Sequence, residues 1–107
     1  MQVQLRTDAS IEGSEGLVAH VTSVVESTLS RFSDRVTLVE VHLSDENGAK
    51  GGGDDKRCSM EARLDGRPAT GVTNHGATLD QAIKGAVEKL ERALDSVEGR
   101  REARRHE

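Results

Sequence analysis

Aromatic residues, cysteines and long apolar runs are scarce in this sequence of 107 residues. Phe32 is its only residue among Phe, Tyr and Trp, so a hydrophobic core must be built from aliphatic side chains. A single cysteine, Cys58, excludes an internal disulfide. No apolar run has the length of a membrane span or the basic start of a signal peptide. These absences predict a cytoplasmic protein that makes no contact with a membrane.

The sequence is acidic, with a formal net charge of −4, but the charge is unevenly distributed. Residues 100–107 hold four arginines and two glutamates, a local charge of +2, which leaves −6 on residues 1–99. Attraction to nucleic acid would therefore need basic residues gathered on one face. The length fits one core, because a domain usually takes about 100–200 residues. We predict a single domain over residues 1–99, followed by a basic, disordered tail over residues 100–107.

Alternating apolar and polar residues predict four strands, of which the last has the weakest pattern. They cover residues 2–6, 36–44, 57–64 and 69–74. Pro68 stands at the start of the fourth strand, where a missing N–H is tolerated. Residues 45–55, with four glycines and several acids, are typical of a mobile hairpin loop.

Apolar residues at helical spacing predict two helices. The first has Ser14 as its N-cap, and its apolar face extends to Phe32. The second has the strongest local pattern, because Thr78 and Gln81 have the spacing of a capping box. Gly99 follows its last apolar residue and is expected to end the helix.

The element order β-α-β-β-β-α predicts an α+β fold. The first two strands can lie parallel through a right-handed helical crossover, and the later strands can follow as antiparallel hairpins. Both helices must then cover one face of the four-stranded sheet, and the other face stays open to solvent or to a partner. The open face is expected to carry Leu38, Glu40, His42, Arg57, Glu61 and Arg63.

Residues that could bind a metal or act in catalysis form no recognisable motif. His20, His42, Cys58 and His75 lack the short spacing of a zinc site, and alternation places His42 and Cys58 on opposite faces of the sheet. The glycine-rich loop lacks the ending of a P-loop, and its acids do not follow EF-hand spacing. No set of nucleophile, base and orienting residue can be proposed. We predict no metal, no cofactor, no small-molecule substrate and no enzymatic activity.

Five segments resemble the ribosome hibernation promoting factor and ribosome-associated inhibitor family, also called the sigma-54 modulation protein family. In the second helix these are TLDQAI at residues 78–83 and EKLERAL at residues 88–94. The strand VEVHLS at residues 39–44, the helix start SEGL at residues 14–17 and the tail REARR at residues 101–105 are similar in kind and in order. The resemblance spans nearly the whole chain and depends on element order and spacing more than on any single stringent motif.

The resemblance implies a four-stranded sheet with two helices on one face, similar in shape to double-stranded RNA-binding domains. It also implies a short-form translation inhibitor and hibernation factor, without the dimerising domain of longer members. Such proteins bind the small ribosomal subunit through ribosomal RNA in stationary phase or stress. Carried over by position, the RNA contacts are Lys84, Lys89, Arg92, Arg100, Arg101, Arg104 and Arg105. Weaker candidates are Arg6, Arg31, Arg35, Arg57 and Arg63.

Two other interpretations stay open. The basic residues of the second helix could be solvated side chains in surface ion pairs, which contribute about 0–1 kcal/mol each. The chain could also be a protein-interaction or regulatory module on the same fold that does not bind ribosomes, which would account for its acidic balance. The scarcity of aromatic residues favours binding of folded RNA through phosphates and shape over stacking on single strands.

Overall fold

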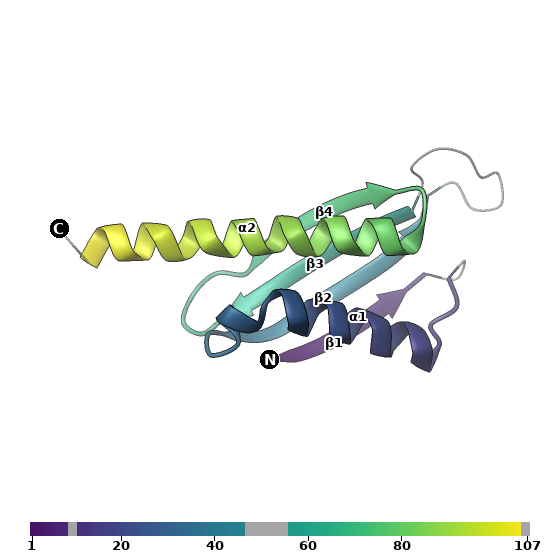
Figure 1. The fold of residues 1–107 in the computed structure, drawn as a ribbon, viewed down its shortest axis with the longest axis horizontal. Helices are drawn as coiled ribbons and strands as arrows, with labels where there is room; N and C mark the ends of the chain where they lie inside the picture. The colour runs from purple at the N-terminus through teal and green to yellow at the C-terminus, as the bar shows by residue number, and fades with distance from the viewer. Residues whose placement is uncertain (9–10, 47–55, 106–107) are drawn as a thin grey trace.

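The computed structural model describes residues 1–8, 11–46 and 56–105, and for residues 98–105 it describes the path of the backbone alone. The predicted hairpin loop at 45–55 lies, from residue 47 onward, outside the described residues. The elements follow the predicted order β-α-β-β-β-α, with one added 3-10 turn, η1 (Figure 1). They are β1 Gln2–Thr7, α1 Glu15–Thr28, η1 Ser30–Phe32, β2 Val36–Asp45, β3 Lys56–Leu64, β4 Thr70–Gly76 and α2 Leu79–Arg105.

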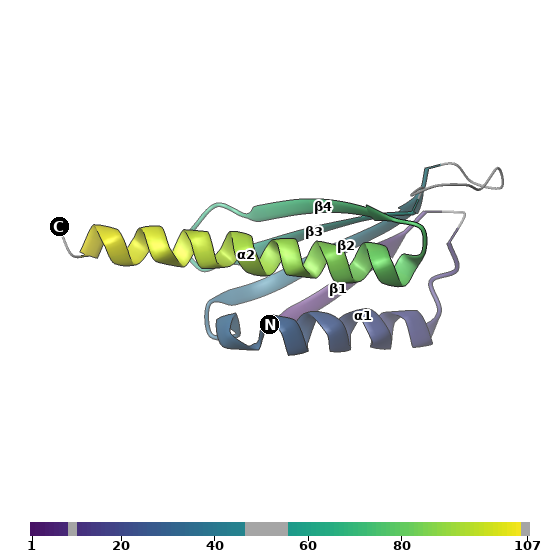
Figure 2. The same cartoon turned by 45° about the horizontal axis from the view of Figure 1, so that its top comes forward.

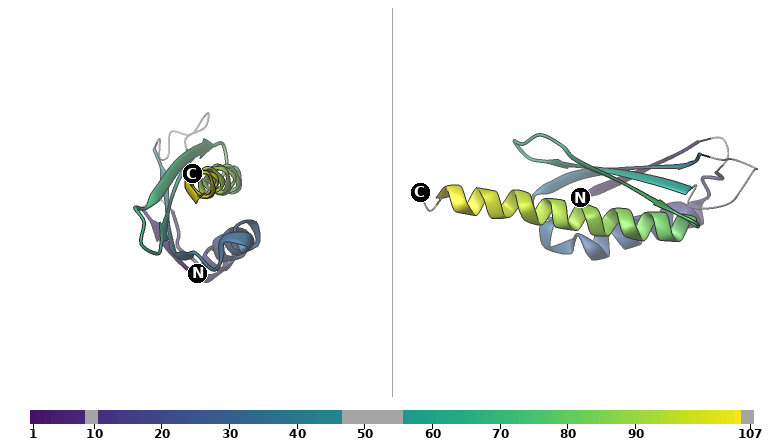
Figure 3. Two further views of the ribbon diagram at one scale, coloured as in Figure 1. Left: turned by 90° about the vertical axis from the view of Figure 1, so that its left-hand side faces the viewer. Right: turned by 90° about the horizontal axis from the view of Figure 1, so that it is seen from above.

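The strands form one sheet in the order β1-β2-β3-β4. β1 and β2 are parallel, with Val3 beside Val39, whereas the β2–β3 and β3–β4 pairs are antiparallel. A parallel pair needs a long crossover, and α1 supplies it. Figures 2 and 3 show both helices on the same face of the sheet, and α2 packs on β3 and β4. The predicted α+β class and its two layers are therefore confirmed.

The core between helices and sheet is aliphatic, as predicted. Val21 and Val25 of α1 and Leu90 of α2 are fully buried against it. The sheet contributes alternate residues of its two central strands: Val39, Val41, Leu43, Cys58, Met60 and Ala62. Full burial of a Val or Leu side chain contributes about 1.5–3 kcal/mol, so this layer is the main source of stability.

The first helix starts as predicted but ends earlier. Ser14 is the N-cap, and its Oγ accepts a hydrogen bond from the N–H of Leu17 at 3.1 Å. The prediction that the helix reaches Phe32 is wrong, because α1 stops at Thr28 and η1 carries Phe32 into the core. Ser and Thr are modest helix formers, and a tighter turn at a helix end is common.

The second helix extends further than predicted. Gly99 does not end α2, which continues to Arg105, so residues 100–105 of the expected disordered tail are helical. A glycine inside a helix is about 1 kcal/mol less favourable than alanine, and the Glu, Arg and Ala residues around it are good helix formers. Their summed preference outweighs one glycine.

Candidate nucleic-acid interface

The start of α2 is fixed to the end of β4 by reciprocal hydrogen bonds. Thr78 Oγ1 accepts from the N–H of Gln81 at 3.1 Å, as the capping box predicts. The side-chain oxygen Oε1 of Gln81 accepts from the N–H of Ala77 at 3.1 Å, one residue before the cap. These bonds set the direction in which α2 leaves the sheet.

Two glycines then allow α2 to approach β4 closely. A Cβ on Gly76 would lie 2.8 Å from the backbone nitrogen of Ala82, and a Cβ on Gly85 would collide with the amide group of Asn74. In the space left free, Asn74 Nδ2 donates to the carbonyl oxygens of Gln81 at 3.4 Å and Ala82 at 3.3 Å. The side of α2 that faces β4 is therefore held at short range.

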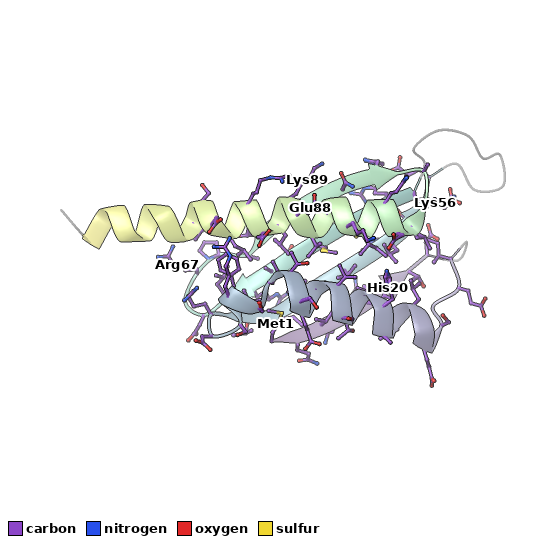
Figure 4. The ribbon with its side chains drawn as sticks, viewed as in Figure 1. Met1, His20, Lys56, Arg67, Glu88 and Lys89 are labelled. Atoms are coloured by element: carbon purple, nitrogen blue, oxygen red, sulfur yellow. The ribbon has the colours of Figure 1, made fainter. Side chains whose placement is uncertain are left out.

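Lys89 and Arg92 lie on this β4-facing side. The ammonium of Lys89 donates to the backbone oxygen of Thr73 in β4 at 3.0 Å, and Figure 4 shows its side chain reaching from α2 toward β4. Arg92 is exposed and follows three residues later, which places it beside Lys89 on the helix surface.

We name this surface the β4–α2 flank. It comprises the helix row Gln81, Gly85, Lys89, Arg92 and Ser96, together with strand β4. Spacings of three and four residues keep such a row on one side of a helix. Neither the row nor β4 contains an Asp or a Glu. Glu88 borders the row on its groove side, four residues before Arg92, so the acid-free part of the flank is the strip between Lys89 and β4.

The α1-facing side of α2 differs in charge, because it carries acidic side chains such as Asp80. Its carboxylate lies 3.0 Å from Nε2 of His20 in α1 and 3.2 Å from Nζ of Lys84. The hydrogen bond with His20, followed by that with Lys84, lowers the pKa of Asp80. Lys84 thus takes part in an ion pair on the side away from β4, and the helix separates it from Lys89 and Arg92.

Arg31 forms the second ionic contact on that side. Its guanidinium donates two hydrogen bonds to Asp95, at 2.7 and 2.6 Å, and its Nε lies 3.8 Å from Glu91. The hydrogen bonds with Arg31 lower the pKa of Asp95 and raise the pKa of Arg31. Between the helices lies a shallow groove of about 460 Å³, lined by Ser23, Val24, Ser27, Thr28, Lys84, Val87, Glu88 and Glu91. Its charged residues are two glutamates and one lysine.

The structure thus distributes the predicted RNA contacts over three places. Lys89 and Arg92 share the β4–α2 flank, and Lys84 lies at the groove. The other four, Arg100, Arg101, Arg104 and Arg105, belong to the last turns of α2, which project beyond the sheet in Figure 1. Their assignment to RNA stays a prediction.

The weaker candidates lie mostly on the open face of the sheet or in ion pairs. Arg63 lies 2.9 Å from Glu40 and 3.9 Å from Glu61, and Arg57 lies 3.6 Å from Glu46. Arg6 lines a shallow depression of about 410 Å³ that also has Glu40, His42 and Glu61 in its wall. Near η1, the Arg35 guanidinium donates to the backbone oxygen of Arg31 and lies 5.8 Å from the Phe32 ring centroid. None of these cations lies on a surface free of acids.

The possible metal ligands are dispersed. His20 contacts Asp80, and His75 Nε2 lies 3.0 Å from Glu46. Cys58 is buried, and burial raises the pKa of its thiol to about 12. Across the part of the chain that the structure describes, no three His, Cys, Asp or Glu residues come close enough to hold a metal ion. In the same residues, no helix is both long and apolar enough to cross a membrane.

The sequence did not identify the β4 side of the interface. Thr73 and Asn74 were placed in a weak strand, and nothing marked them as neighbours of Lys89. A helical projection of α2 would have placed Lys89 and Arg92 in one row, but it would not have separated that row from Glu88, four residues before Arg92. It could not have indicated which of the two sides meets β4.

The fold and the flank together define a small α+β binding domain, with its basic surface along an edge strand and a long helix. The chain belongs to the sigma 54 modulation protein / S30EA ribosomal protein family, whose profile matches residues 4–102. This membership confirms the resemblance to ribosome hibernation factors. The family consists of ribosome-associated factors and not of enzymes.

Solved structures agree with this assignment. The Protein Y N-terminal domain of Thermus thermophilus is 23% identical, with a TM-score of 0.67, over 85% of this chain and 92% of that one. A ribosomal subunit interface protein from Coxiella burnetii is 16% identical, with a TM-score of 0.70, over 92% of this chain and 99% of that one. At these identities the likeness shows the fold alone. A comparison with curated proteins found no match.

Proposed function

We propose that this protein is a cytoplasmic hibernation factor that binds ribosomal RNA of the small subunit and blocks translation in stationary phase or stress. The β4–α2 flank is the observation that carries the proposal. It brings Lys89 and Arg92 beside a strand that contains no Asp or Glu, in a chain whose formal net charge is −4. Family membership, and the subunit interface protein among the similar structures, support the ribosome as the partner.

The chemistry of the flank suits a phosphate backbone. Lys89 already donates to a carbonyl oxygen, so its ammonium is held in place beside β4, where a phosphate oxygen could share it. Arg92 can donate two parallel hydrogen bonds to a phosphate. The backbone of α2 continues beyond the sheet to Arg105, so the four predicted arginine contacts belong to the same helix as Lys89 and Arg92. The protein would inhibit by occupying the site and would need no bond-making step.

A salt series tests the proposal. The full chain is sedimented with small ribosomal subunits, and the binding constant is measured as salt increases. For the double variant Lys89→Gln and Arg92→Gln, we expect the slope of log K against log salt to fall by about two, since each lost phosphate contact removes about one. Lys84→Gln is the matched control, because it neutralises a cation of the same helix on the other side, and it should leave the slope nearly unchanged.

Two results would overturn the proposal. One is a protein that stays in the soluble fraction even at low salt. The other is a slope that falls for Lys84→Gln and not for the double variant, which would move the interface to the groove.

A protein-interaction module is the second candidate function, and the groove between the helices favours it. Glu88 and Glu91 line that groove, and α1 has no Lys or Arg along its length. A surface of this charge repels RNA and would attract a basic protein segment. Binding that persists for the double variant but is lost for Glu88→Lys with Glu91→Lys would support this alternative.

A further inference from the structure

The two edge strands of the sheet differ in how well they are protected against pairing with a further strand. Figure 1 shows β4 at one edge, where α2 runs beside it, and β1 at the other. On β4, the carbonyl oxygen of Thr73 accepts a hydrogen bond from the ammonium of Lys89. β1, in contrast, has no lysine, no proline and no bulge, which are the usual devices that prevent an edge strand from pairing.

The hydrogen-bond pattern identifies which groups of β1 point outward. Asp8 donates its N–H to Leu43 of β2, so even-numbered residues direct their backbone groups toward β2. Backbone direction alternates along a strand, and therefore Val3, Leu5 and Thr7 direct N–H and C=O groups to the outer edge. A strand added there would find a regular set of donors and acceptors.

Apolar side chains beside this edge are incompletely covered. Val3 and Leu5 are half-buried on the helix side of the sheet, and Met1 packs next to them. Val18 of α1 is 42% exposed and is the one large hydrophobic side chain exposed among the described residues. At about 100° per residue, Val18 and Val24 lie on opposite sides of the buried Val21. Val24 lines the groove toward α2, so Val18 lies toward the β1 edge.

We propose that β1 is a self-association edge, at which β1 of a second copy of this chain adds in antiparallel orientation. The two-fold axis passes through Gln4. Val3 then faces Leu5 of the second copy, and Gln2 faces Arg6 of the second copy. In this register the outward backbone groups of Val3 and Leu5 form the hydrogen-bonded pairs of an antiparallel ladder.

The sequence of β1 supports a second copy as the occupant. Gln4 lies between the apolar residues Val3 and Leu5, and the polar residues Gln2 and Arg6 follow on either side. An antiparallel copy of the strand therefore pairs apolar residues with apolar residues and polar residues with polar residues. The sole charge of the strand, on Arg6, meets an amide and not another arginine. The helices of both copies lie on the same face of the extended sheet, and Val18 of each copy faces the interface between the two β1 strands. The two β4–α2 flanks remain at the outer edges, so the inference does not depend on ribosome binding.

The experiment measures the mass of the full chain by light scattering or sedimentation over a concentration series. We expect the mass to rise from 11.5 kDa toward twice that value. Gln4→Lys places like charges face to face on the axis, and should weaken association at least about tenfold. Gln4→Glu should do the same. An equimolar mixture of the two variants should restore association, since opposite charges then meet.

Circular dichroism melts of both variants establish that each chain is folded before its mass is interpreted. Gln4 is exposed on the open face, so the substitutions leave the core intact. A constant mass of 11.5 kDa at every concentration overturns the proposal. So does a dimer that the two variants leave unchanged, or a mixture that associates no better than either variant alone. A strand from another protein would then remain the occupant to be sought at this edge.

Discussion

Along α2, the side that faces α1 and the side that faces β4 are held to the domain by different chemistry. Asp80 forms a hydrogen bond with His20 of α1, and Asp95 forms an ion pair with Arg31 of η1, both solvent-exposed. Toward β4, glycines and the Asn74 amide allow close approach, and the charges that remain there are cationic. The comparison shows how one helix in an acidic chain can keep cations beside an edge strand, while Asp80 and Asp95 find partners on the other side of the helix.

The largest effect should appear at Cys58, which lies in β3 under α2. Burial raises its thiol pKa from 9.0 to about 12, so the thiolate fraction near pH 8 should be about a thousandfold lower than for an unperturbed thiol. We expect native-state alkylation to be slower by at least that factor. Mass spectrometry after a timed pulse of iodoacetamide gives the rate, with urea-unfolded protein as the control. Equal rates in the two states would contradict the burial.

Next in size is the close contact with β4. Gly85→Leu should lower the free energy of unfolding by about 1–3 kcal/mol, because the new side chain collides with Asn74. Urea titration followed by circular dichroism measures this, and the variant should also alkylate faster at Cys58. Gly16→Ala on α1 is the matched control, since its Cβ meets only the Ser14 Oγ at 3.8 Å and should be neutral or stabilising. Equal stability of the Leu variant and wild type would mean that α2 is not held closely to β4.

A single acid on the flank should produce a smaller change, in ribosome binding. Ser96→Glu adds a negative charge to the row of Lys89 and Arg92, and we expect affinity for the small subunit to fall about threefold to tenfold at low salt. Ser27→Glu adds the same charge in the groove between the helices, where little change is expected. If Ser27→Glu lowered the affinity for the small subunit more than Ser96→Glu, the RNA-binding surface would be the groove between the helices and not the β4–α2 flank.

The smallest effect concerns the ion pairs with Asp80 and Asp95. Both have a pKa below the ordinary 3.8, so each stabilises the fold at pH above that value, and the contribution is lost as pH falls through the lower folded-state pKa. Asp95→Asn should therefore be less stable than wild type near neutral pH, and the difference should shrink in acid. Urea titrations at both pH values measure it. For Lys89→Gln the difference from wild type should not change over this acidic range, because Lys89 contacts a backbone carbonyl oxygen and not a carboxylate.

The sequence predicted the element order, both N-caps and the aliphatic core, since these depend on local spacing. It missed the end of α1 and the continuation of α2 past Gly99. In both cases one residue was weighed too heavily: Phe32 as a helical residue, although it reaches the core from η1, and Gly99 as a stop, although its neighbours favour helix. Of the seven predicted RNA contacts, three were placed in the second helix and could not be divided between its sides. The other four were placed in a disordered tail, whereas α2 continues to Arg105.

The sequence by itself determined that Lys89, Arg92 and Ser96 share one row of a helix, because the helical period fixes their spacing. It also determined the family, through the order and spacing of its elements. Only the tertiary structure decided that the side with Lys89 faces β4 and the side with Asp80 faces α1. That choice depends on how α2 docks: Gly76, Gly85 and Asn74 permit close approach on one side, and His20 and Arg31 supply partners on the other.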